Sequence, residues 1–226
     1  MKKVCYAHGV NDGPGLRERK KQRTRETITR VALELFDEGG YDATTLADIA
    51  EAAEISPRTI FAYFPSKEAI LFSEFPAMRD ALERELANRP AGKDVLEVVA
   101  DFLVSAVARP ENAEIEHRRV RIVESDETLR NQMQARLAGF EEVVAAAIAG
   151  ELGAPKNDLR PLLAAASLMA GFGVMFKSVS SRKRPPAPEQ LAAFIDPIVT
   201  FVRGGLEATG RIRDAEGDGE RTRSTD

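Results

Sequence analysis

Apolar residues recur at spacings of three and four along most of the chain, which is the pattern of amphipathic helices. A first helix is expected from about Arg17 to Glu38, and its buried face consists of Ile28, Val31, Ala32, Leu35 and Phe36. Further helices are expected over about 66–88 (with a break before Pro76), 94–108, 112–123, 126–152, 157–180 and 188–208. No convincing strand run is found, so the pattern predicts an all-α fold.

Residues 44–67 read TTLADIAEAAEISPRTIFAYFPSK and predict two short helices joined by a tight turn. Thr45 can cap the first helix, with Asp48 completing a weak capping box. Ser56 can cap the second, whose first position is taken by Pro57. This arrangement is typical of a helix-turn-helix, whose second helix enters the major groove of DNA. A small helical hairpin inside an all-α core would have the same spacing.

The net charge of −4 argues against a uniformly basic nucleic-acid binder, but the basic residues are unevenly placed. A cluster within nine residues precedes the helix-turn-helix: Arg17, Arg19, Lys20, Lys21, Arg23 and Arg25. Such asymmetry favours a DNA-binding end joined to an acidic body. This basic arm either projects beyond the core or folds on meeting phosphate. The alternative is a solvated, charged helix end.

From Arg25 to Phe72 the chain resembles the DNA-binding domain of the TetR family of bacterial transcriptional regulators. The matching residues are Ala32, Leu35, Phe36, Gly40, Tyr41, Thr44, Thr45, Ile49, Ala50, Ala53, Ile55, Ser56, Thr59, Ile60, Tyr63, Phe64, Lys67 and Leu71. The resemblance implies a three-helix DNA-binding domain over 17–65 and a helical ligand-binding and dimerisation domain over 66–208. Residues 1–16 and 209–226 are expected to be disordered tails, because they lack helical periodicity.

Candidate DNA contacts follow from the helix-turn-helix and from the resemblance. The basic arm would contact phosphates or reach a minor groove through Arg17, Lys20, Lys21, Arg23 and Arg25. Thr45 would meet a phosphate from its helix N-terminus. Arg58, Thr59 and Phe61 would face the groove, with Arg58 the best candidate for a guanine. Tyr63 and Lys67 match the phosphate-contacting positions of the family.

The body of the resembled family binds a small molecule and forms the dimer. Two apolar helices are expected to meet those of a second copy as a four-helix bundle, through Leu163, Ala166, Ala170, Phe194, Ile198 and Val202. Alternatively, they only fill their own core. The expected ligand pocket is lined by Phe102, Phe140, Met169, Phe172, Met175 and Phe176, although each could be plain core.

The segment from Arg118 to Gly153 and on through Ala170 is similar, more loosely, to a subgroup with an acyl-CoA-like ligand-binding body. That similarity implies an apolar cavity with basic residues near its mouth. Arg118, Arg119 and Arg121 could meet a phosphate or a carboxylate there. They could equally be surface salt-bridge partners.

Several function classes are disfavoured by what the sequence lacks. It has no uncharged apolar run of about 18 residues and no secretory h-region, so a cytoplasmic protein is expected. Its single cysteine, Cys5, provides no disulfide framework. The two histidines, His8 and His117, lie far apart, and no catalytic or phosphate-loop motif is present. We expect neither an enzyme nor a cofactor or metal.

Together these features predict a dimeric repressor that binds a palindromic operator in double-stranded DNA and is released by a small apolar or amphipathic ligand, such as an acyl-CoA-like compound. The sequence leaves open a ligand-independent architectural or constitutive DNA-binding protein. An interaction module that has lost DNA binding is disfavoured by the intact basic arm and by Tyr63 and Lys67.

Overall fold

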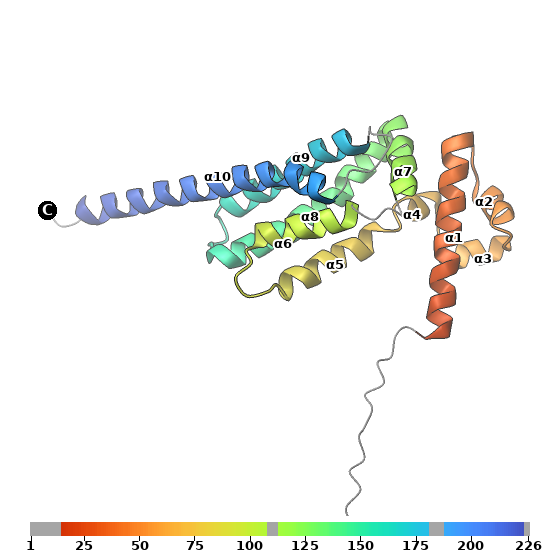
Figure 1. Cartoon of the computed structure of the whole chain (residues 1–226), viewed down its shortest axis with the longest axis horizontal. Coiled ribbons are helices and arrows are strands. Elements are labelled where there is room, and N and C mark those ends of the chain that lie inside the picture. The colour runs from red at the N-terminus through yellow and green to blue at the C-terminus, as the bar shows by residue number, and fades with distance from the viewer. Residues whose placement is uncertain (1–14, 108–112, 181–187, 224–226) are drawn as a thin grey trace, which may run out of the picture. The chain divides into compact units, whose positions relative to one another are not determined.

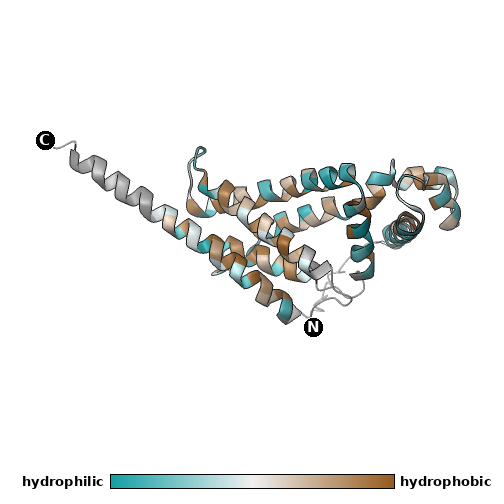
Figure 2. Ribbon diagram, turned by 90° about the horizontal axis from the view of Figure 1, so that it is seen from above, coloured by the Kyte–Doolittle hydropathy of each residue, from teal (hydrophilic) through white to brown (hydrophobic). Residues whose placement is uncertain are grey.

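A computed structural model describes residues 15–107, 113–180 and 188–223, which form ten helices and no strand, as the hydrophobic pattern predicted (Figure 1). The chain divides into two units, unit 1 ending at Leu71 and unit 2 beginning at Phe72. Apolar and polar residues alternate along the helices of both units (Figure 2). None of the described helices is long and apolar enough to cross a membrane.

Unit 1 contains α1 (Leu16–Gly39), α2 (Leu46–Ala52), α3 (Pro57–Tyr63) and α4 (Lys67–Leu71). Because α1 packs against both α2 and α4, its buried sector is wider than a single stripe. Leu33, which the sequence analysis missed, is fully buried, whereas the predicted core residue Leu35 is only half-buried. The core of this unit consists of Ile28, Val31, Ala32, Leu33, Phe36, Ile49, Ala50, Ile60, Phe64, Ile70 and Leu71.

The connection from α1 to α2 is held by backbone conformation and by one buried hydroxyl. Gly40 has φ 90° and ψ 145°, a region that is almost restricted to glycine. The Thr44 hydroxyl donates hydrogen bonds to the Gly40 carbonyl at 2.9 Å and to the Leu35 carbonyl at 3.3 Å. These contacts bring the chain back so that α2 can pack on α1.

Unit 2 contains α5 (Phe75–Ala87), α6 (Val95–Val107), α7 (Ala113–Ser125), α8 (Glu127–Leu152), α9 (Arg160–Ser180) and α10 (Pro188–Arg223). Helix α8 contacts α5, α6, α7 and α9, and α10 packs along α9 and α6 (Figure 1). The core between them includes Val99, Phe102, Val144, Ile148, Leu168, Phe172, Leu191 and Ile195.

Local signals placed several helix ends correctly. The break predicted before Pro76 is the turn between α4 and α5. Asp126 caps α8, and Gly153, in the left-handed region at φ 56°, ends it. The last helix differs from its prediction, since α10 continues beyond Ala208 to Arg223 through part of the expected tail. No proline follows Pro197, and the charged residues there are compatible with a helix.

Substituting Gly40 by alanine should lower the free energy of unfolding by about 1–3 kcal/mol, because a Cβ is strained at this positive φ. Gly39→Ala is the matched control, since Gly39 is helical and its added Cβ would lie 3.8 Å from the Thr44 hydroxyl oxygen, an ordinary contact. Thermal unfolding followed by circular dichroism compares the two. Equal midpoints would contradict the role given to Gly40.

Candidate nucleic-acid interface

The helix-turn-helix consists of α2, the turn over 53–56 and α3. The Thr45 hydroxyl accepts from the Asp48 amide at 3.2 Å, and the Asp48 carboxylate accepts from the Thr45 amide at 2.8 Å, which confirms the predicted capping box. Hydrogen bonds from the Thr45 side chain and amide lower the pKa of Asp48. The turn passes through Glu54 at φ 54°, and the Ile55 amide donates to the Ala50 carbonyl at 2.9 Å. This tight closure fixes where α3 begins.

Helix α3 buries one face and presents the other. The Ser56 hydroxyl accepts from the Thr59 amide at 3.1 Å and contacts the Thr59 hydroxyl at 2.7 Å, with Pro57 at the first helical position. Ile60 is fully buried, while Arg58 is exposed and Phe61 keeps 60% of its surface exposed. Arginine can hydrogen-bond to base edges, and an apolar side chain can contact the methyl group of thymine. The exposed face of α3 is therefore suited to contact with DNA.

Arg25 has a role that the sequence analysis missed. Its Nη1 donates to the Tyr63 carbonyl at 3.0 Å, and its guanidinium lies 4.3 Å from the centre of the Phe64 ring. Both partners lie at the C-terminal end of α3, 38 and 39 residues away in sequence. In the structure Arg25 is half-buried and holds α3 on α1, and its predicted contact with DNA stays a prediction. A long-range contact of this kind leaves no local sequence signal.

Lys67 is likewise engaged within the protein. Its Nζ donates to the Tyr41 carbonyl at 2.6 Å and to the Asp42 carbonyl at 3.4 Å, and it lies 4.5 Å from the centre of the Tyr41 ring. These contacts tie the start of α4 to the connection after α1. Tyr63 is half-buried at the end of α3. Phosphate contacts by Lys67 and Tyr63 stay predictions, as does the one assigned to Thr45, whose hydroxyl donates to Asp48 at 2.7 Å.

The basic arm is helical and belongs to α1. Arg17, Lys20, Lys21 and Arg23 are exposed, so their charges are available to phosphates. The predicted basic arm therefore has two parts. The cations before Thr24 are exposed, whereas Arg25, after it, contacts the end of α3. Contact of these exposed cations with DNA remains a prediction.

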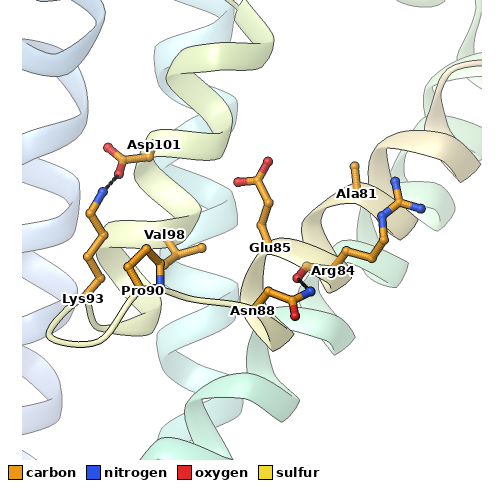
Figure 3. A pocket seen from close by; sticks show the side chains of 8 residues that line it. All are labelled: Ala81, Arg84, Glu85, Asn88, Pro90, Lys93, Val98 and Asp101. Atoms are coloured by element: carbon orange, nitrogen blue, oxygen red, sulfur yellow. Dashed lines mark hydrogen bonds and ion pairs between the residues drawn. The ribbon is translucent and has the colours of Figure 1, made fainter. Parts of the chain in front are cut away.

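The residues predicted to line a ligand pocket lie mainly in the core of unit 2. Phe102, Phe140, Phe172 and Met175 are buried, whereas Met169 and Phe176 are half-buried. A groove of about 460 Å³ lies instead along α5, α6 and their connection (Figure 3). Within it Lys93 pairs with Asp101, and the Asn88 side chain donates to the Arg84 carbonyl at 2.8 Å. None of the six predicted residues lines this groove. The pocket stays a prediction.

The residues predicted for the dimer interface divide between surface and core. Leu163 is 61% exposed and Ala170 is exposed, while Ala166 and Phe194 are half-buried. Val202 lies in the core of its own chain, and a Cβ added at Gly171 would stand only 2.5 Å from Ile198, so α9 and α10 pack closely there. The large exposed apolar residues of these helices are Leu162, Leu163, Val174 and Phe201.

No group of three or more His, Cys, Asp or Glu side chains that could hold a metal occurs among the described residues. Cys5 and His8 lie outside them.

Two family models match the chain. Residues 28–73 match the model described as bacterial regulatory proteins of the tetR family, and residues 93–223 match the MftR C-terminal domain. TcmR, an HTH-type transcriptional regulator of Streptomyces glaucescens, is 42% identical over 105 residues, which is 46% of each chain. The match therefore spans about half the length of TcmR. MftR of Mycobacterium tuberculosis, named for regulation of mycofactocin biosynthesis, is 31% identical over 144 residues, or 63% of this chain and 73% of MftR.

Solved structures share the fold. FadR of Thermus thermophilus, described as a transcriptional repressor in complex with lauroyl-CoA, aligns with a TM-score of 0.51 at 23% identity. The alignment covers 79% of this chain and 92% of FadR. At this identity the likeness concerns the fold alone.

Replacing Arg25 by alanine should lower the free energy of unfolding by about 1–3 kcal/mol, because a hydrogen bond and a cation–π contact are lost together. Lys21→Ala, in the exposed part of the same helix, should change it by less than about 0.5 kcal/mol. Urea unfolding followed by circular dichroism measures both. If the two variants are equally stable, Arg25 does not hold α3.

Proposed function

The chain belongs to the TetR family of bacterial transcriptional regulators, and on that premise we propose that it is a homodimeric repressor that binds a palindromic operator and is released from it by a small ligand. DNA binding through the helix-turn-helix and regulation of transcription are properties of the family. Four points are proposed beyond this: the dimer, repression rather than activation, the ligand, and the residues that contact DNA.

The exposed face of α3 is the observation that carries the proposal. Arg58 and Phe61 are exposed there, while Ile60 and Phe64 are buried on the opposite side. Arginine can donate two hydrogen bonds to the O6 and N7 atoms of guanine, which makes Arg58 the residue assigned to base reading. The exposed cations of α1 supply attraction to phosphates that does not depend on sequence.

A two-fold dimer would bring two copies of α3 to successive major grooves, about 34–36 Å apart. The apolar residues exposed on α9 and α10 support such a dimer. Leu163 is 61%, Val174 72% and Phe201 76% exposed, and burying side chains of this size against a second copy is favourable. The same two helices would then meet the same helices of the partner, as an isologous interface requires.

Release by a ligand is supported by the match to the MftR C-terminal domain and by the lauroyl-CoA bound to FadR. For release, the ligand must have a higher affinity for the conformation that cannot bind DNA than for the conformation that binds it. A tenfold weaker operator affinity requires about 1.4 kcal/mol of coupling between the two sites.

Phe201→Glu should weaken the dimer at least about tenfold, because a charge replaces an apolar side chain in the proposed interface. Asn131→Glu, which adds the same charge at an exposed position of α8, serves as the control. Sedimentation velocity at micromolar concentration should find the first variant monomeric and the second dimeric. If both variants have the same oligomeric state, α10 is not part of the dimer interface.

Arg58→Ala should weaken binding to an operator selected from random DNA by about 1–3 kcal/mol and relax the preference at one base pair. Arg30→Ala is the control, since Arg30 is exposed on α1 and pairs with Glu34 at 3.2 Å. Competition binding with all substitutions of the operator measures the preference. A loss that is equal for every sequence would make Arg58 a phosphate contact.

A further inference from the structure

Arg119 is an unusual residue of unit 2 because it carries a charge and is only 3% exposed. It lies on the buried side of α7 together with Ile122 and Val123. Its neighbour Arg118 pairs with Glu114 at 2.8 Å and is partly exposed, as expected of a surface ion pair. Arginine is rarely buried to this extent unless its hydrogen-bonding groups find partners, so the surroundings of Arg119 need an explanation.

One edge of the Arg119 guanidinium has no acceptor. Nη1 donates to the Glu116 carboxylate at 2.8 Å, but Nε and Nη2 are buried and have no hydrogen-bond partner among the described residues. These two nitrogens form the side edge of the planar group, where two N–H bonds point in nearly the same direction. That edge fits the two oxygens of one carboxylate or phosphate group.

Glu116 alone does not satisfy the donors of the buried guanidinium. It occupies only Nη1, and its side chain is 36% exposed. Desolvation raises the pKa of Glu116 above its ordinary value, Arg119 opposes this, and the negative charge of Glu74 adds to the rise. The guanidinium therefore keeps two unused donors, Nε and Nη2, in surroundings shielded from water.

We infer that Arg119 anchors the carboxylate of an amphipathic monocarboxylic acid, which binds the free Nε and Nη2 edge. The inference rests on the proposed ligand-released repressor and names the chemical class of its ligand. A carboxylate is favoured over a phosphate monoester, which can carry two negative charges and would face the carboxylates of Glu116 and Glu74. The rest of the ligand is apolar, because Ile122 and Val123 share the buried side of α7.

The burial of Arg119 also explains how such an acid would act. A ligand reaches a side chain that is 3% exposed only when the residues that cover it have moved. An acid that binds only this opened conformation shifts the population toward it. The charge of Glu74 acts on Glu116, and Glu74 is the N-cap residue of α5. The conformational change at Arg119 would therefore also affect the start of α5.

The test uses octanoate and laurate as probes, with octan-1-ol and dodecan-1-ol as uncharged controls of equal chain length. At saturation, at least one acid should raise the unfolding midpoint of the full chain by about 5 °C or more and weaken operator binding about tenfold. The alcohols should do neither. Lauroyl-CoA, which has phosphates but no free carboxylate, tests the phosphate alternative.

Arg119→Met and Arg119→Lys separate the anchor from a structural ion pair. Arg119→Met removes the ion pair with Glu116, so its unfolding midpoint without ligand serves only to show that the variant folds. Both variants should bind the operator as the parent does and lose the response to the acids, because lysine lacks the paired donors. Lys156→Gln, which removes an exposed positive charge between α8 and α9, should retain the response.

Loss of operator binding without ligand in both Arg119→Met and Arg119→Lys would mean that Arg119 is a structural residue and would overturn the inference. So would a response to the acids that survives in Arg119→Met, or no response to either acid in the parent. A response to lauroyl-CoA alone would assign the ligand to a phosphate and would also overturn it. Failure of the parent to bind any operator sequence would reject the proposed function instead, whatever the acids do to the unfolding midpoint.

Discussion

The hydrogen bond from Arg25 to the Tyr63 carbonyl holds the C-terminal end of α3, and the proposed reading of DNA depends on the position of that helix. A helix of seven residues has too few internal hydrogen bonds to be stable alone, so its position depends on contacts at its two ends and on its buried face. Ser56 and Pro57 organise the first turn, Ile60 and Phe64 enter the core, and Arg25 holds the last turn. Because these contacts hold the buried face of α3, Arg58 and Phe61 can stay exposed to solvent while the helix keeps its geometry.

What could be predicted from sequence depends on how local the determining interactions are. The caps of α2 and α3 were predicted because each joins residues three positions apart. The partners of Arg25 and Lys67 lie 38 and 26 residues away, so the sequence indicated two cations but not that they hold unit 1 together. For α9 and α10, periodicity identified apolar faces; it could not separate Val202, in the core, from Phe201, at the surface.

Two features of unit 2 are energetically unfavourable on their own. Helices α9 and α10 leave large apolar residues in water, and α7 buries a guanidinium edge without an acceptor. Both states are unfavourable compared with a structure in which the apolar surface is covered and the charge is paired. A second copy would complete the first, and a carboxylate ligand would complete the second. In the proposed regulator, the dimer interface therefore lies on α9 and α10, and the ligand anchor lies on α7.

Binding of the purified protein to DNA from just upstream of its own gene, compared with scrambled DNA at several salt concentrations, tests the central claim most directly. If α3 reads base edges while α1 attracts phosphates, affinity for both DNAs falls with salt, but the native sequence keeps its advantage near physiological ionic strength. Equal and weak binding to both DNAs would show that the operator does not lie in this promoter. Absence of binding to either DNA at low salt would contradict DNA reading by α3.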